Sequence, residues 1–253
     1  MTTTRTQTPP PRHPDPRADG TSDVRVWWWR IPSDTFSRSD LELLNAAEAE
    51  NARRIKSATG AAQYVTCRAA VRRVLAEVLR VPHGEISLGR KPCPECGSAE
   101  HGPPAVLTPD AGRAIHLSLS HTGGLGMLAV SRLPVGVDVE AERDQWSPEL
   151  ADKVLSPRER ASVLATPAPA RTRAFLRCWT RKEAVLKAVG IGIVTTLSAL
   201  ETHPELTGPV EMTTDALGSL SAWQVMDVKV PEGWTASVAL PLGTGQDISV
   251  HPV

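Results

Sequence analysis

The sequence predicts an α+β fold made of two similar subdomains in a pseudo-twofold arrangement. Two pairs of similar segments carry this prediction. The helix-like segment YVTCRAAVRRVLA begins at Tyr64, and a similar segment, FLRCWTRKEAVLK, begins at Phe175, 111 residues later. The strand-like segment GMLAV begins at Gly126, and TASVA begins at Thr235, 109 residues later. Near-equal separations indicate an internal duplication, with chance similarity of short helical segments as the alternative.

The duplication divides the chain into three parts. Residues 1–20 are rich in Pro, Thr and Arg, and we expect them to form a disordered tail. Residues 21–133 are expected to form an N-terminal α+β subdomain, and residues 134–253 a C-terminal one. A ligand site is then expected between the two subdomains.

The composition is that of a compact protein without a dominant charge. Hydrophobic residues make up 41% of the 253 positions, which is enough for a buried core. Lys plus Arg and Asp plus Glu both number 28, so no net field attracts the whole molecule to nucleic acid or to an anionic membrane. Four cysteines without an apolar signal-peptide run favour a reducing cytoplasm over a disulfide framework.

The first expected elements are a strand and two helical segments. Residues 24–31, VRVWWWRI, are typical of a strand, and its three tryptophans are expected to pack in the core rather than to form a binding stripe. Ser39 or Asp40 is expected to cap a first helix. A second helix is expected over residues 61–79, before a Pro and a Gly that end it.

The segment HLSLSHTGG contains a histidine at a turn. Alternating Leu117 and Leu119 predict a strand that leads through Ser120 and His121 into the Gly-Gly turn. A histidine in this place can donate to a phosphate, or it can bond to the local backbone.

The segment VGVDVE predicts a strand with two carboxylates on one face. Its valines occupy alternate positions, so Asp138 and Glu140 share the other face. Carboxylate pairs of this kind suit Mg²⁺ bound jointly by protein and phosphate. A solvated strand edge is the alternative for this motif taken alone.

The segment CWTRKEAVLKAVG predicts a helix that ends at Gly190. Glu183 and Lys187 lie four residues apart and therefore share one face of this helix. Taken alone, the pair is typical of a surface ion pair of little energetic consequence.

The three motifs together closely resemble those of the surfactin-synthetase-type 4′-phosphopantetheinyl transferases, in the holo-carrier-protein synthase superfamily. The similarity lies in the order and spacing of SxSH, GVDVE and WxxKEAxxK, and it extends from the VWWWR strand to Lys187. The resemblance implies a pseudo-duplicated α+β fold. It also implies that a serine of an acyl or peptidyl carrier protein attacks the β-phosphate of coenzyme A and releases adenosine 3′,5′-bisphosphate.

The resemblance also implies roles for individual residues. Asp138, Glu140 and Glu183 correspond to Mg²⁺ ligands, so that the C-terminal subdomain carries most of the metal site. Glu183 is also the candidate general base, and Lys187 the residue that stabilises developing charge. The implied coenzyme A contacts are His121, which matches the histidine that binds the 3′-phosphate, with Ser120 before it and Lys182 in the helix. Trp179 is expected to pack rather than to take part in the chemistry.

Two positions depart from the family pattern. Gln63 stands where relatives often have an arginine that reaches the 3′-phosphate, and Pro103 stands where they often have a lysine or arginine. Nearby cationic side chains can compensate, because a flexible base from a neighbouring turn can serve a phosphate. The candidates are Arg53, Arg54, Lys56 and Arg68.

Two rival functions and one further motif remain open at this point. A magnesium-dependent phosphodiesterase or nuclease is one rival, and a non-catalytic homologue that binds coenzyme A or carriers is the other. The motif is Cys93-Pro-Glu-Cys96 with His101, which has the ligand types of a zinc knuckle, with a reduced loop as the alternative. We expect a cytoplasmic monomer; carrier, pathway and tolerated acyl group are not readable from the sequence.

Overall fold

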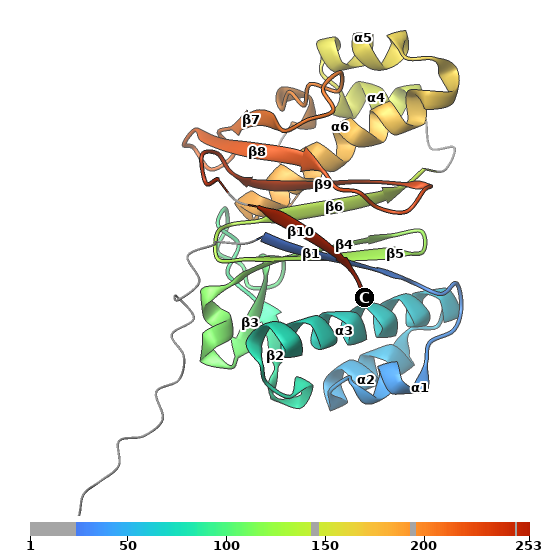
Figure 1. Ribbon diagram of the computed structural model, residues 1–253, viewed down its shortest axis with the longest axis vertical. Helices are drawn as coiled ribbons and strands as arrows, with labels where there is room; N and C mark the ends of the chain where they lie inside the picture. Colours follow the sequence, from blue (N-terminus) through green and yellow to red (C-terminus); the bar gives the residue numbers. More distant parts are fainter. Residues whose placement is uncertain (1–23, 143–146, 193–195, 246) are drawn as a thin grey trace, which may run out of the picture.

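The computed structural model describes residues 24–142, 147–192, 196–245 and 247–253 (Figure 1). The predicted disordered tail, residues 1–20, lies outside this part of the chain. Two four-stranded sheets pack face to face, and a long helix covers the outer face of each, so the molecule has four layers (Figure 1). The prediction of a mixed α and β architecture is confirmed.

The first sheet has the strand order β10-β1-β5-β4. Its strands are β1 (Val24–Arg30), β4 (His116–Thr122), β5 (Leu125–Ser131) and β10 (Ile248–Pro252). Helix α3 (Ala58–Leu79) packs its apolar face against this sheet, where Trp27 and Trp29 are buried in the same cluster. Trp28 points to the opposite face and packs between the sheets, so all three tryptophans belong to the core as expected.

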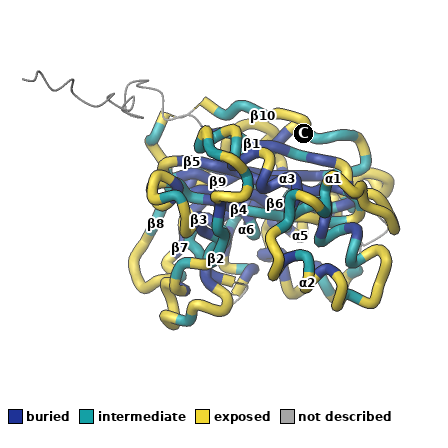
Figure 2. The backbone as a smooth tube through the Cα atoms, turned by 90° about the horizontal axis from the view of Figure 1, so that it is seen from below, coloured by how far each residue is buried: buried dark blue, intermediate teal, exposed yellow. Residues whose placement is uncertain are grey.

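The second sheet has the order β6-β9-β8-β7 and is covered by helix α6 (Ala168–Val189). Its strands are β6 (Gly136–Ala141), β7 (Val210–Thr214), β8 (Ser221–Asp227) and β9 (Trp234–Pro241). The valines of the VGVDVE segment face the first sheet, where Val137 and Val139 pack with Met127 in one buried cluster. Figure 2 shows the buried backbone running through the strands of both sheets, and β5 is buried at every position.

Four short α-helices, a small two-stranded sheet and three short 3₁₀ helices complete the described part of the fold. The α-helices are α1 (Arg38–Glu42), α2 (Ala46–Arg54), α4 (Pro148–Val154) and α5 (Pro157–Ala165), and the strands are β2 (Ser87–Arg90) and β3 (Pro104–Thr108). The 3₁₀ helices are His83–Glu85, Asp110–Ala114 and Leu197–Ala199. The expected first helix, capped by Ser39 or Asp40, is wrong in two respects: Ser37 caps α1, and the segment breaks into two helices. The break has a local cause, because Asn45 and Glu48 form a reciprocal capping box that starts α2.

The two halves have similar parts, and one strand crosses between them. Helices α3 and α6 both contain 22 residues and both end at a left-handed residue, Arg80 and Gly190. Strand β10, however, pairs in parallel with β1 and so joins the first sheet. Residues 248–252 of the expected C-terminal subdomain thus pair with the first sheet, and the division between residues 133 and 134 and the pseudo-twofold relation both stay predictions. In the described part of the chain, no helix is both long and apolar enough to span a bilayer.

Candidate functional site

The sequence-predicted residues meet where the edge strands β4 and β6 of the two sheets approach each other. The backbone N–H of Val137 donates to Ser118 Oγ at 2.9 Å, and that of Val139 donates to Ser120 Oγ at 3.3 Å. Serine side chains thus satisfy backbone groups that an edge strand would otherwise leave unpaired. These bonds fix β6, and with it Asp138, against the N-terminal half.

Gly136 allows helix α6 to lie directly on β6. A Cβ atom at this position would lie 1.8 Å from the carbonyl oxygen of Ala184 and 2.5 Å from the nitrogen of Ala188. Such distances are far inside van der Waals contact, so only glycine permits this approach. The close approach brings Glu183 and Lys187 of α6 over the carboxylates of β6.

We therefore expect Gly136→Ala to destabilise the protein by about 3 kcal/mol, since the added methyl group must push α6 away from the sheet. Urea unfolding followed by circular dichroism measures this change. Gly208→Ala is the matched control, because nothing lies within 4 Å of a Cβ atom there. Equal stability of the two variants would contradict the close-contact account.

Asp138 is the most buried of the three carboxylates. One oxygen, Oδ1, accepts from Lys187 Nζ at 2.6 Å and from Ser120 Oγ at 2.7 Å. The other oxygen, Oδ2, is buried and has no hydrogen-bond partner among the described residues, and the same holds for Glu183 Oε1. Buried carboxylate oxygens without a donor are costly, so each of these atoms calls for a cationic or donor ligand.

Glu140 is partly buried and accepts hydrogen bonds from the side chains of Thr122 and Trp179. The bond from Trp179 corrects the expectation of a packing role alone, although Trp179 also packs against Phe175 with ring centroids 6.4 Å apart. The signal for this bond is the spacing, because Trp179 precedes Glu183 by four residues and therefore shares the helical face of Glu183 and Lys187. Thr122 had no such signal, because its partner lies on another strand.

The electrostatics of this acidic centre, formed by Asp138, Glu140 and Glu183, favour a bound cation. Burial raises the pKa of Asp138, although the nearby charge of Lys187 opposes this shift. The pKa of Glu140 is also raised, mainly by burial and then by the negative charge of Asp138. For Glu183, burial and the charge of Asp138 raise the pKa to about 7. Negative charge is therefore in excess, and a divalent cation offsets it.

The donor set fits magnesium. All three residues offer hard carboxylate oxygens, two of them with an unsatisfied buried atom. The ligand atoms of the three carboxylates do not all lie within 4.8 Å of one another, to judge from the described residues. Oxygens bound directly to one Mg²⁺ at about 2.1 Å are at most about 4.2 Å apart, so in this arrangement at least one carboxylate would reach the ion through one of the waters that Mg²⁺ keeps.

The raised pKa of Glu183 predicts how the metal-free protein responds to pH. Because the folded-state pKa of about 7 exceeds the ordinary value of 4.5, the stability that neutral Glu183 contributes is lost as pH rises between these two values. In EDTA at pH 8, Glu183→Gln should therefore be more stable than the wild type by about 2–3 kcal/mol, and at pH 4.5 nearly equal to it. Thermal unfolding across this pH range tests the prediction, and a constant difference would overturn it. Added Mg²⁺ should narrow the gap at pH 8.

His121 lies beside the acidic centre at the end of β4. Its Nδ1 atom makes a hydrogen bond with the side-chain amide of Gln63 on α3. Desolvation and the nearby charge of Lys187 lower the pKa of His121, although a backbone hydrogen bond opposes them. Gln63, singled out as a departure from the family pattern, therefore stands directly at the expected phosphate contact.

Lys182 does not belong to this site, which corrects the expectation of a cofactor contact. Its side chain is fully buried, and its ammonium donates to Glu159 Oε2 at 2.6 Å and to two backbone carbonyls. These bonds use all three donors of the ammonium group. The physical reason is its direction, since Lys182 lies about 100° around the helix from Glu183.

Arg53 and Arg68, the expected compensating bases, remain predictions. Arg53 pairs with Glu50 of its own helix at 2.9 Å and is largely exposed. Arg68 is partly exposed on α3, where its guanidinium lies 5.5 Å from the centre of the Tyr64 ring. Neither of these contacts involves His121 or a residue of the acidic centre.

Comparison with known proteins gives a consistent match. Residues 134–239 match the family model described as the 4′-phosphopantetheinyl transferase superfamily. The chain is 27% identical to the 4′-phosphopantetheinyl transferase HetI of Nostoc sp. over 85% of this chain and 87% of HetI. It is 38% identical to the 4′-phosphopantetheinyl transferase AcpT of Salmonella typhi over 42% of this chain, and 31% identical to a phosphopantetheinyl transferase of Thraustochytrium sp. over 67% of it. These two matches cover 56% and 62% of the relatives' own lengths, less than two thirds.

Proposed function

Because residues 134–239 match the model of the 4′-phosphopantetheinyl transferase superfamily and the chain is similar to HetI over 87% of that protein, we propose that it is a member of this superfamily. We propose that it transfers the 4′-phosphopantetheine group of coenzyme A to a serine of acyl or peptidyl carrier proteins. The released product is adenosine 3′,5′-bisphosphate. The observation that carries this proposal is the acidic centre, in which Asp138 and Glu183 each keep a buried oxygen without a hydrogen-bond partner among the described residues. The rival functions, a phosphodiesterase and a non-catalytic homologue, receive no support from the matched proteins.

Asp138, Glu140 and Glu183 are proposed to hold Mg²⁺. When bound, the ion supplies positive charge to the pyrophosphate of coenzyme A and to the leaving phosphate. Ser120 supports this role indirectly, because its hydroxyl donates to Asp138 Oδ1 and leaves Oδ2 for another ligand. Ser120 is thus a positioning residue for Asp138 rather than a direct cofactor contact.

Glu183 is proposed as the general base. A carboxylate that shares a metal ion can still accept a proton, and Glu183 keeps one buried oxygen, Oε1, without a hydrogen-bond partner among the described residues. The carrier serine passes its hydroxyl proton to Glu183 while its oxygen bonds to the β-phosphorus of coenzyme A. The bond from this phosphorus to the oxygen that bridges the two phosphates breaks, and adenosine 3′,5′-bisphosphate leaves with that electron pair.

Lys187 and His121 are proposed to bind phosphate oxygens. The ammonium of Lys187 has three donors, and the described contacts to Asp138 and Ser120 use two of them. His121 is exposed at the end of β4, where its imidazole can donate to the 3′-phosphate of coenzyme A. We also propose that the protein acts as a monomer, since both sides of the site come from the same chain. We propose the cytoplasm as its location.

The nucleotide product separates transfer from simple hydrolysis. The protein, coenzyme A and Mg²⁺ are incubated with an apo carrier or with the same carrier whose acceptor serine is replaced by alanine. Chromatography should detect adenosine 3′,5′-bisphosphate in the reaction with the serine-containing carrier and not in the reaction with the alanine variant. Equal product with both carriers would identify a phosphodiesterase instead.

A further inference from the structure

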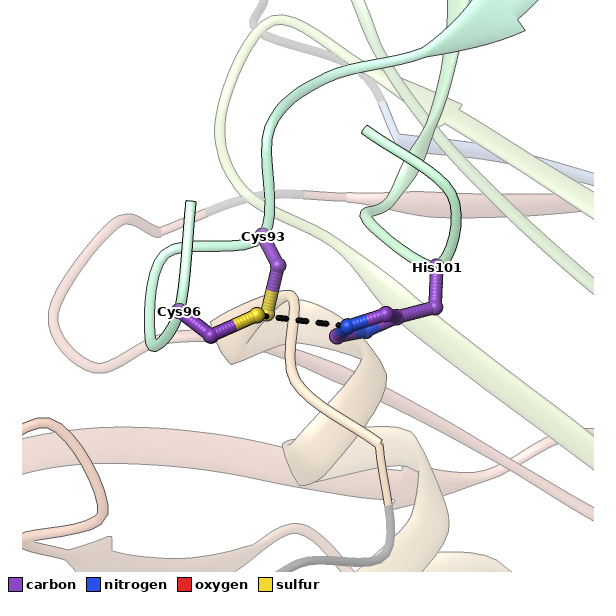
Figure 3. Close-up of side chains that lie close together, drawn as sticks. All are labelled: Cys93, Cys96 and His101. Atoms are coloured by element: carbon purple, nitrogen blue, oxygen red, sulfur yellow. Dashed lines mark hydrogen bonds between the residues drawn. The ribbon is translucent and has the colours of Figure 1, made fainter. Parts of the chain in front are cut away.

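The loop between β2 and β3 holds a compact group of metal-ligand side chains away from the acidic centre. Cys93, Cys96 and His101 point toward one another (Figure 3), and their ligand atoms all lie within 4.8 Å of each other. The sulfur of Cys96 lies 3.2 Å from Nε2 of His101. Ligand atoms around a tetrahedral zinc ion are separated by about 3.5 Å, given bonds of roughly 2.0 to 2.3 Å.

The backbone of this loop is shaped to stabilise the thiolate of Cys93. The N–H groups of Glu95 and Cys96 both donate to the sulfur of Cys93, and such bonds favour the charged form of a thiol. The turn is closed by the N–H of Gly97, which donates to the carbonyl of Cys93 at 2.8 Å. Gly97 has a φ of +75°, a conformation that glycine adopts without strain.

The loop has little apolar burial of its own. Most of residues 91–103 are exposed, with Cys93 and Gly102 as its buried positions. All four cysteines of the chain are free thiols, so no disulfide compensates for the small apolar core of this loop. A loop of this kind is ordered most effectively by a bound metal, whose binding free energy adds to folding.

We propose that Cys93, Cys96 and His101 bind a zinc ion, with a water molecule as the fourth ligand. Sulfur and nitrogen ligands select zinc over Mg²⁺, which takes oxygen ligands. The two thiols release two protons on binding, and the neutral imidazole keeps its Nδ1 proton when Nε2 bonds to the metal. The described residues offer no fourth His, Cys, Asp or Glu within the group, which leaves that position to water.

This zinc site would brace the end of the helix that carries Glu183 and Lys187. A Cβ atom at Gly190, the C-cap of α6, would lie 3.2 Å from Pro94 and 3.3 Å from Pro103. Pro94 directly follows Cys93, Pro103 lies two residues after His101, and both pack against this helix end. Pro103, which replaces an expected base, thus has a packing role here.

Cobalt substitution tests the proposal without relying on activity. The purified chain is stripped of metal in EDTA under reducing conditions and titrated with CoCl₂. We expect a thiolate-to-cobalt charge-transfer band that saturates at about one ion per chain and disappears when ZnCl₂ is added. Cys96→Ser should abolish the band, whereas Cys67→Ala, which removes a cysteine outside the group, should keep it. Asp138→Asn should also keep it, because the acidic centre supplies no sulfur.

Any of three outcomes would overturn the proposal. The first is the absence of a charge-transfer band in the wild-type protein, and the second is a band that persists in Cys96→Ser. The third is a Cys93–Cys96 disulfide that forms in air-equilibrated buffer even when zinc is present, detected by counting thiols. Protection of the wild-type thiols from iodoacetamide by added ZnCl₂ gives a readout that needs no variant. Because none of these measurements uses a carrier protein, the zinc proposal can fail while the transferase proposal stands, and the reverse.

Discussion

Glu183→Gln is expected to lower the rate of carrier modification by about a thousandfold while the protein stays folded. The amide keeps the shape of the side chain but removes a charge from the acidic centre and the group proposed to accept the serine proton. Initial rates at saturating coenzyme A measure the loss, which should appear mainly in kcat. Metal dependence of the residual rate should also weaken.

The matched control is Glu211→Gln, which makes the same chemical change at an exposed position of β7. It should leave both kcat and KM unchanged. If Glu183→Gln kept the activity of this control, Glu183 would be neither a metal ligand nor the base. A rise in KM alone would limit Glu183 to binding.

Lys182→Met is expected to cost about 3–5 kcal/mol of stability, because it leaves the carboxylate of Glu159 buried without its cation. Both side chains are fully buried, and Glu159 also accepts from the backbone N–H and hydroxyl of Thr202. These bonds tie helix α5 and the segment after α6 to α6 itself, the helix that carries Glu183 and Lys187. Urea unfolding gives the change in free energy.

An exposed ion pair provides the control for this prediction. Arg158 and Glu205 are 3.2 Å apart with side chains 65% and 42% exposed, and Arg158→Met should change stability by less than about 1 kcal/mol. A second variant, Lys182→Met with Glu159→Leu, removes both buried charges and should recover part of the loss. If Lys182→Met proved as mild as Arg158→Met, the buried pair would not hold this region together.

Local patterns were enough to predict the parts of the site that lie on one element. Alternation in VGVDVE placed Asp138 and Glu140 on one face of β6, and the four-residue spacing placed Glu183 and Lys187 on one face of α6. The break between α1 and α2 was also readable, since Asn45 and Glu48 have the spacing of a capping box.

Contacts between distant elements could not be predicted in this way. The bond from Ser120 to Asp138 depends on two edge strands meeting, and the pairing of Lys182 with Glu159 depends on how α5 packs on α6. The pairing of β10 with β1 likewise has no local signal, because it joins the two ends of the described chain. Each of these contacts changed the interpretation of a residue or a boundary.

The mass of the carrier protein tests the central claim most directly. An apo carrier is incubated with coenzyme A and the wild-type chain in Mg²⁺, in EDTA, or with Glu183→Gln in place of the wild type, and the intact carrier is then weighed. The account predicts a gain of one phosphopantetheine group, on the acceptor serine, in the Mg²⁺ reaction with the wild-type chain, and little or no gain in the other two. The account would be contradicted if the wild-type chain in Mg²⁺ left every acyl and peptidyl carrier tested unmodified. An equal gain in carrier mass in EDTA would also contradict it.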